Sequence, residues 1–241
     1  MTGSAQAAHI DRFYALLAAL TEKVGRPRLR DCSADHGRPT HGVYFFFEDG
    51  EARADDRTPR VVRIGTHGLN ARSQTTLWHR LRQHRGTLAG RHAGGGNHRG
   101  SIFRLHVGTA LMNSQTWPPE IRETWLRPKV DAQARAAEQP LERAVSTHIG
   151  AMPVLCLAVP EREHRRVIEA NTIALLSQRS GGIDQASAGW LGRHAASKQV
   201  RASALWNVNH VDDVYDPAFL DLLEQAVRPA RDGGHGLWSQ W

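Results

Sequence analysis

Residues 42–47 read GVYFFF and residues 61–65 read VVRIG, and these two stretches decide the fold. Both are rich in β-branched and aromatic residues, which favour strands. The hydrophilic segment 49–56 between them has the composition of a hairpin loop, so we expect the two strands to pair antiparallel. Both faces of the first strand are apolar, which is typical of a strand in the centre of a sheet.

Further elements are predicted outward from this pair of strands. Residues 153–159 form a short apolar stretch, predicted as a buried strand, whereas the apolar run 102–111 fits either a strand or a helix. The predicted helices cover residues 5–23, 75–85 and 218–227, and two more begin near Pro140 and Glu163.

The charge balance favours an acidic partner. The 241 residues include 31 basic and 24 acidic side chains, for a formal charge of +7, and Lys23, Lys129 and Lys198 are the only lysines. Arginine presents a planar fork that suits phosphate groups and guanine edges, so we expect a nucleic-acid partner. The alternative is that the arginine bias reflects the base composition of the genome.

Several classes of protein are disfavoured. Hydrophobic residues make up 40% of the chain and charged residues 23%, as in an ordinary globular protein, and no apolar run has the length of a membrane span. Cys32 and Cys156 form no CxxC motif, which favours a reducing, cytoplasmic location. The fourteen histidines contain no HExxH motif, so we do not expect structural zinc.

The predicted helix at residues 75–85 carries an arginine and a histidine one turn apart. Helical spacing puts Arg80 and His84 on one stripe with Leu77 and Leu81, beside the core. An arginine there needs an anion, which a phosphate would supply through two parallel hydrogen bonds. The alternative is a pair with an internal carboxylate.

Tyr44 and Glu169 are the other two candidates for chemistry. Tyr44 is either a core residue with a satisfied hydroxyl or a phenol that activates a water molecule at the edge of the sheet. Glu169 lies within the apolar arc of its predicted helix, near Ile173 and Leu176, where a lone carboxylate is costly. We expect it to bind Mg²⁺ or Mn²⁺, because such ions are often held by only one or two protein carboxylates; the alternative is a salt bridge to an arginine.

The order of these motifs resembles the GIY-YIG nuclease family. The motifs GVY, RIG, Arg-x-x-x-His and a glutamate followed by two leucines fall within residues 41–180. The resemblance implies an α+β fold with a small, three-stranded antiparallel sheet flanked by helices, here with extra helical elements at both ends. It also implies cleavage of DNA phosphodiester bonds with one divalent metal ion.

The resemblance assigns a role to each candidate. Tyr44 matches the tyrosine that acts as general base or orients water, and His84 matches a histidine expected to hydrogen-bond to Tyr44 or to that water. Arg80 matches the arginine that holds the scissile phosphate and stabilises its developing charge. Glu169 matches the glutamate that binds the metal.

The motif glycines match, and two positions depart from the pattern. Gly42 and Gly65 match glycines that permit close packing of the backbone. Arg63 stands where the family has its second tyrosine; we count it among the catalytic residues because it could contact phosphate. The window after Glu169 lacks the family's asparagine, for which Asn171 or Asn207 are the possible substitutes.

The predicted function is a metal-dependent DNA endonuclease of a restriction or defence kind, with RNA left open as a substrate and the oligomeric state undetermined. The predicted segments are residues 1–40, a nuclease core at 41–185, and a tryptophan-rich accessory region at 186–241 that could contact the target. Alternatives are an inactive nucleic-acid-binding protein on a nuclease fold and a partner-binding protein. The residues predicted to contact nucleic acid are His67, Arg82, Arg85, Asn97, His98, Arg99 and Asn207.

Overall fold

The described chain contains two consecutive strands near its start and a third strand much later, with helices before, between and after them. The computed structural model describes residues 3–33, 39–70, 72–87, 93–180 and 182–228. The strands are β1 (Gly42–Ala52), β2 (Pro59–Gly65) and β3 (Val154–Ala158). The α-helices are α1 (Gly3–Val24), α2 (Leu77–Arg85), α3 (Ile102–Ser114), α4 (Pro119–Trp125), α5 (Ala132–Ala137), α6 (Gln139–Ala151), α7 (Arg162–Leu176), α8 (Lys198–Ser203) and α9 (Phe219–Val227). Short 3₁₀ helices are η1 (Leu29–Asp31), η2 (His98–Gly100), η3 (Gln178–Ser180) and η4 (Leu191–His194).

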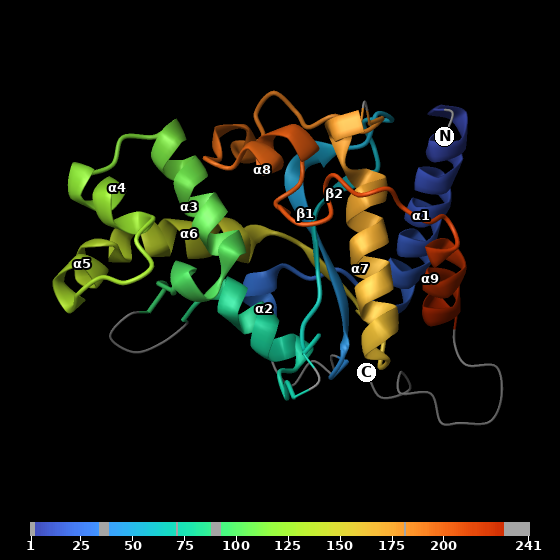
Figure 1. Cartoon of the computed structure of the whole chain (residues 1–241), viewed down its shortest axis with the longest axis horizontal. Helices are drawn as coiled ribbons and strands as arrows, with labels where there is room; N and C mark the ends of the chain where they lie inside the picture. The colour runs from blue at the N-terminus through green and yellow to red at the C-terminus, as the bar shows by residue number, and fades with distance from the viewer. Residues whose placement is uncertain (1–2, 34–38, 71, 88–92, 181, 229–241) are drawn as a thin grey trace.

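The strands form a small antiparallel sheet in the order β2-β1-β3. Tyr44 on the central strand lies opposite Gly65 of β2 and Cys156 of β3. In Figure 1, α1, α7 and α9 lie together on one side of the sheet, and α3 to α6 extend away on the other. The structure therefore confirms the predicted fold class and the central position of the first strand.

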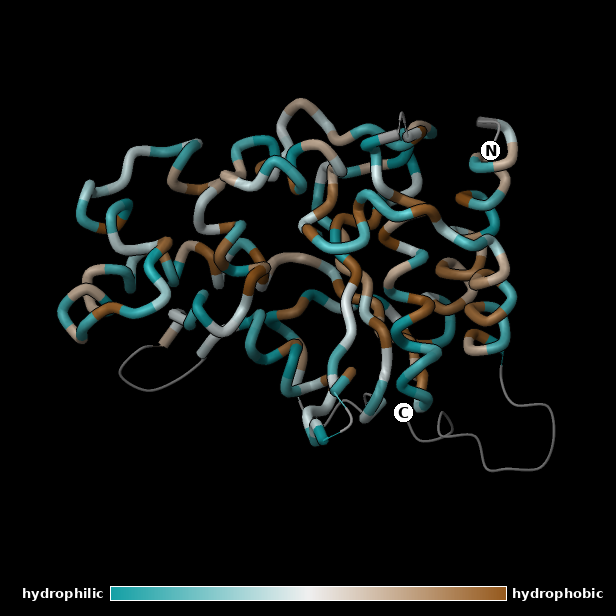
Figure 2. Tube along the Cα trace, viewed as in Figure 1, coloured by the Kyte–Doolittle hydropathy of each residue, from teal (hydrophilic) through white to brown (hydrophobic). Residues whose placement is uncertain are grey.

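Each face of the sheet has its own hydrophobic core. Tyr44 and Phe46 pack into one core with α2, α3 and α6, and Val43, Phe45 and Phe47 pack into the other with α1, α7 and α9. Figure 2 shows the apolar residues concentrated along the sheet and the helices next to it. Burial of each large apolar side chain contributes roughly 2 kcal/mol, so these two cores supply most of the stability.

The apolar run 102–111, which the sequence left undecided, forms helix α3. Ser101 caps this helix, its hydroxyl accepting a hydrogen bond from the Arg104 amide at 3.4 Å. Gly108 lies so close to the Trp125 ring that a Cβ there would come within 2.2 Å of it. Because nearly all sides of α3 are buried, its sequence shows no polar face by which a helical period could be recognised.

Asn207 covers the outer edge of β2. Its Oδ1 accepts from the Ile64 amide at 3.1 Å, and its Nδ2 donates to the Ile64 carbonyl at 2.9 Å. The Trp206 amide also donates to the Val62 carbonyl at 2.7 Å. Asn207 is buried, so the prediction that it contacts nucleic acid is wrong: its side chain completes the hydrogen bonding of an edge strand.

We predict that Asn207→Ala lowers the free energy of unfolding by about 2 kcal/mol, because a buried N–H and a buried C=O of Ile64 both lose their partners. Urea denaturation followed by circular dichroism measures this change. The control is Asn209→Ala, an exposed asparagine two residues later, which should leave stability unchanged. Equal stability of the two variants would contradict the edge-capping role.

Candidate active site

A chain of hydrogen bonds joins the central strand to helices α2 and α3. The Tyr44 hydroxyl lies 2.9 Å from His84 Nε2, and His84 Nδ1 lies 2.8 Å from the Ser101 hydroxyl. Tyr44 and His84 are both buried. The predicted hydrogen bond between Tyr44 and His84 is confirmed, and the phenol therefore has one fixed partner inside the protein.

Gly65 makes room for this arrangement, and Gly42 makes room for the neighbouring strand β3. A Cβ on Gly65 would lie 2.2 Å from the Tyr44 hydroxyl, so the phenol ring passes directly over the backbone of β2. A Cβ on Gly42 would lie 2.1 Å from the Leu157 carbonyl on β3. Both positions exclude any larger residue without displacement, which explains why glycine stands in each motif.

The environment of His84 keeps its imidazole neutral. Burial lowers the pKa of His84 well below its ordinary value, and the positive charges of Arg80, Arg63 and Arg104 lower it further. A neutral imidazole donates from one ring nitrogen and accepts at the other. His84 can therefore accept from Tyr44 while donating to Ser101, or the reverse, but it is a weak base for a free proton.

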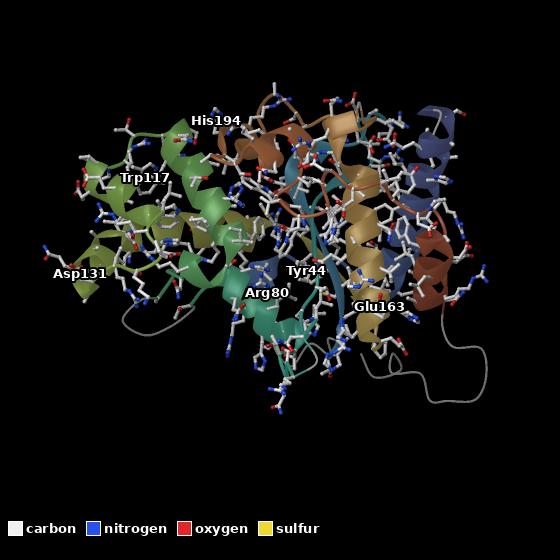
Figure 3. The ribbon with its side chains drawn as sticks, viewed as in Figure 1. Tyr44, Arg80, Trp117, Asp131, Glu163 and His194 are labelled. Atoms are coloured by element: carbon white, nitrogen blue, oxygen red, sulfur yellow. The ribbon has the colours of Figure 1, made fainter. Side chains whose placement is uncertain are left out.

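Arg80 lies at the rim of the site. Its side chain is partly exposed, and Nη1 donates to Gln83 Oε1 at 3.0 Å and to the Gly100 carbonyl at 3.5 Å. Within the described residues no carboxylate lies within ion-pair distance of Arg80, so the internal salt bridge considered from the sequence is not formed there. Figure 3 shows Tyr44 in the sheet and Arg80 on the neighbouring helix α2.

Glu169 reaches the end of β2 from helix α7. Its Oε1 accepts a hydrogen bond from the Thr66 amide at 3.2 Å, and the side chain is partly buried. Burial raises the pKa of Glu169, and this rise is offset in part by the charges of Arg63, His210 and Arg80 and by the Thr66 amide. The charges of Arg63 and Arg80 thus lower the pKa of Glu169, although neither arginine forms an ion pair with it.

Arg63 is a buried cation beneath the site. Its Nη1 donates to the Trp206 carbonyl at 2.5 Å, and its guanidinium lies 5.0 Å from the centre of the Phe103 ring. Its charge acts on both His84 and Glu169. These internal contacts favour an electrostatic influence on the site over the direct phosphate contact that we considered from the sequence.

The donor set at Glu169 fits a hard divalent cation that keeps most of its water. In the described ranges, no cluster of three or more His, Cys, Asp or Glu side chains could hold a metal ion. Mg²⁺ is commonly bound through one or two carboxylates, with the remaining positions filled by water and substrate phosphate. Glu169 uses Oε1 for the Thr66 amide, and no hydrogen bond to Oε2 is formed within the described chain, so that oxygen is available to a cation.

Comparison with known proteins places the chain in a family. A match to the GIY-YIG domain covers residues 4–232, which is nearly the whole chain and spans all three predicted segments. The chain belongs to the GIY-YIG family. No curated protein and no solved structure matches it. Among the described helices, none is long and apolar enough to cross a membrane.

Three of the residues that we expected to contact nucleic acid in this GIY-YIG protein are buried, and these predictions are wrong. Both ring nitrogens of His98 are bonded internally, Nδ1 to Glu142 at 2.8 Å and Nε2 to the Trp125 carbonyl at 2.8 Å. Arg85 donates to the Cys32 carbonyl, and His67 Nε2 lies 3.2 Å from a ring nitrogen of His41.

Other predicted contacts remain at or near the surface. Arg82 is exposed. Asn97 is exposed, and its Oδ1 accepts from the Arg99 amide at 3.1 Å. Arg99 forms a bidentate ion pair with Glu138, in which Nη1 lies 2.7 Å from Oε2 and Nη2 lies 2.8 Å from Oε1. Asn171, the other possible substitute for the family's asparagine, donates to the Val167 carbonyl and accepts from the Asp216 amide, so its amide is used within the fold.

The tryptophans of the accessory region belong to the core. Trp190 and Trp206 are buried, with ring centres 5.3 Å apart, and both indole N–H groups donate to Glu48 Oε2. The expectation that they contact a DNA target is therefore wrong. Trp238 and Trp241 lie outside the described residues.

Sequence reasoning missed the supporting partners of the site. Ser101 orients His84 and caps α3, and the Thr66 amide orients Glu169. The signal for Ser101 was present, because a serine directly before an apolar run is a typical helix cap. The Thr66 contact uses the backbone, which no residue type reveals.

We predict that Glu169→Gln stabilises the metal-free protein at neutral pH by about 1 kcal/mol, as is common when a charge is removed from a strained functional site. Burial raises the pKa of Glu169 in the folded state, so its protonated form favours folding. This contribution to stability is fully present below the ordinary pKa of glutamate. That contribution is lost as the pH rises through the raised value. The gain from Glu169→Gln should therefore disappear in acid.

Urea denaturation in EDTA across this pH range tests the prediction. The control is Glu163→Gln on the same helix, where the exposed carboxylate pairs with Arg166 and its pKa is lowered, so no gain is expected. Equal stability of Glu169→Gln and the wild type at neutral pH would contradict a strained glutamate.

Proposed function

We propose that this GIY-YIG protein is a divalent-metal-dependent endonuclease that hydrolyses DNA phosphodiester bonds. One observation carries the proposal: Tyr44 is bonded to His84, one turn from Arg80 on α2, and lies opposite Gly65, whose neighbour Thr66 donates to Glu169. We infer that the guanidinium of Arg80, the phenol of Tyr44 and the carboxylate of Glu169 act together at the end of the sheet. A phosphodiester is the anion that such a set would bind.

Arg80 would hold the scissile phosphate. Its guanidinium can donate two parallel hydrogen bonds to phosphate oxygens, and such bonds strengthen as negative charge develops during attack. The few bonds that Arg80 makes are to neutral groups, Gln83 and the Gly100 carbonyl, which a phosphate can replace without leaving a buried ion unpaired.

Tyr44 would orient the attacking water through a hydrogen bond to its phenol oxygen, and His84 would hold the phenol in position. When His84 Nδ1 donates to Ser101, its Nε2 accepts the hydrogen bond of Tyr44, and the phenol oxygen can then accept from water. Because the pKa of His84 is lowered, the imidazole orients the phenol, and the proton that the attacking water loses passes to a phosphate oxygen or to solvent.

Glu169 would hold the divalent ion through its available carboxylate oxygen. When bound, Mg²⁺ or Mn²⁺ supplies Lewis-acid stabilisation of the phosphate and of the leaving oxygen. The neighbouring charges of Arg63 and Arg80 favour the ionised form of Glu169, which is the form that binds a cation.

We predict that Glu169→Ala and Arg80→Ala each reduce divalent-dependent cleavage of supercoiled plasmid by at least about a hundredfold, the cost of removing one group that stabilises the transition state. Matched controls are Glu163→Ala, an exposed glutamate on α7, and Arg57→Ala, an exposed arginine in the β1–β2 loop. Both controls should cut at the wild-type rate.

The same assay separates the alternatives. Wild-type rates in both site variants would show that the site is assigned to the wrong residues. Salt-dependent DNA binding by the wild type without any cleavage, in Mg²⁺ or Mn²⁺, would favour an inactive nucleic-acid-binding protein. Absence of both cleavage and DNA binding would favour a partner-binding protein.

A further inference from the structure

A pocket of about 840 Å³ lies beside Arg80, between helix α2, the segment 96–100 and the helices α5 and α6. Gln83 and Gly100, the two residues to which Arg80 donates hydrogen bonds, both line this pocket. The pocket therefore begins where the scissile phosphate is proposed to bind. In Figure 1, α5 lies across from α2, on the side away from α7.

The lining of the pocket is basic. Four arginines line it, Arg82, Arg85, Arg99 and Arg135, against two glutamates, Glu138 and Glu142. Arg85 is buried and bonded to the Cys32 carbonyl, so the argument uses the exposed Arg82 and Arg135.

Both glutamates are already neutralised. Glu138 is bound by Arg99, and Glu142 by the buried Arg104 and by His98. Arg82 and Arg135 are exposed, and neither forms an ion pair within the described chain. Arg82 and Arg135 thus add positive charge to the wall, and no carboxylate of the described chain pairs with either of them.

The size of the pocket restricts what can enter. Its volume lies within the range of sites for small organic ligands, so it can hold one or two nucleotides but not a base-paired duplex. Guanidinium planes stack on unpaired bases and pair with backbone phosphates, and the exposed amide of Asn97 is suited to a base edge.

We propose that this pocket binds an unpaired stretch of the DNA strand next to the scissile phosphate, so that the protein prefers duplexes with an unpaired extension over fully paired ones. The inference rests on the proposed function, because that function places the strand at Arg80. Arg82 on α2 and Arg135 on α5 hold the strand from opposite walls.

The test measures binding in EDTA, so that it does not depend on cleavage. The probes are a fluorescein-labelled blunt duplex and the same duplex with a short unpaired extension, at either end of the strand. The wild type is expected to bind the better extended probe about tenfold more tightly, the effect of stacking one base on the protein. Equal affinity for blunt and extended probes overturns the proposal.

Variants assign the preference to the pocket. Arg135→Ala and Arg82→Ala should each weaken binding of the extended probe about fivefold to tenfold and leave the blunt duplex within about twofold. Arg135→Lys, which keeps the charge, should retain part of the preference. Arg57→Ala is the control for overall charge and should change neither probe. The proposal is overturned if the pocket variants weaken both probes equally, or if Arg57→Ala has the same effect as Arg135→Ala.

Failure of this proposal is distinguishable from failure of the nuclease function. A protein that cuts plasmid but binds both probes equally retains the proposed function and lacks the strand pocket. A protein that cuts nothing but shows the preference, and loses it in Arg135→Ala, retains the pocket. Thermal unfolding of each variant, expected to match the wild type because Arg82 and Arg135 are exposed, shows whether a loss of binding comes from a loss of folding.

Discussion

The hydrogen bond between Tyr44 and His84 is the constraint on which the site depends. It connects the central strand to helix α2 through the Tyr44 phenol, which packs against the backbone of Gly65, where there is no side chain. His84 is held from its other nitrogen by Ser101, so the rotation of α2 about its axis is fixed. Arg80, one turn earlier on the same face, is placed at the rim as a consequence. Rotation of the helix by a single residue would carry the guanidinium away.

Within the described chain, Arg80 and Glu169 form no ion pair with a group of opposite charge. Arg63 and Arg80 lower the pKa of Glu169 while burial raises it, and no ion pair joins these groups in the described chain. A phosphate would supply the negative charge that Arg80 lacks, and a divalent ion would compensate Glu169. The described chain therefore holds a carboxylate destabilised by burial and an arginine without an ion pair, an arrangement that costs stability and that the proposed phosphate and cation would relieve.

Most of the fold could be predicted from the sequence, and so could the hydrogen bond between Tyr44 and His84, whereas the roles of Tyr44, Arg80, His84 and Glu169 stay predictions. Apolar residues on both faces around Tyr44 indicated a central strand, and helical spacing placed Arg80 and His84 on one face. The predictions for His98 and Asn207 failed because their partners, Glu142 and Ile64, are distant in the sequence. Both residue types are common at surfaces, and only the tertiary packing shows that these two are buried.

The central claim is that Glu169 holds the divalent ion of a GIY-YIG active site. Anomalous diffraction from crystals soaked in Mn²⁺ tests it directly, because the ion is located without reference to activity. We predict one strong anomalous peak at the carboxylate of Glu169, on the side facing Arg80, and its loss in crystals of Glu169→Ala. A peak at other residues, or one that persists in the variant, would contradict the account.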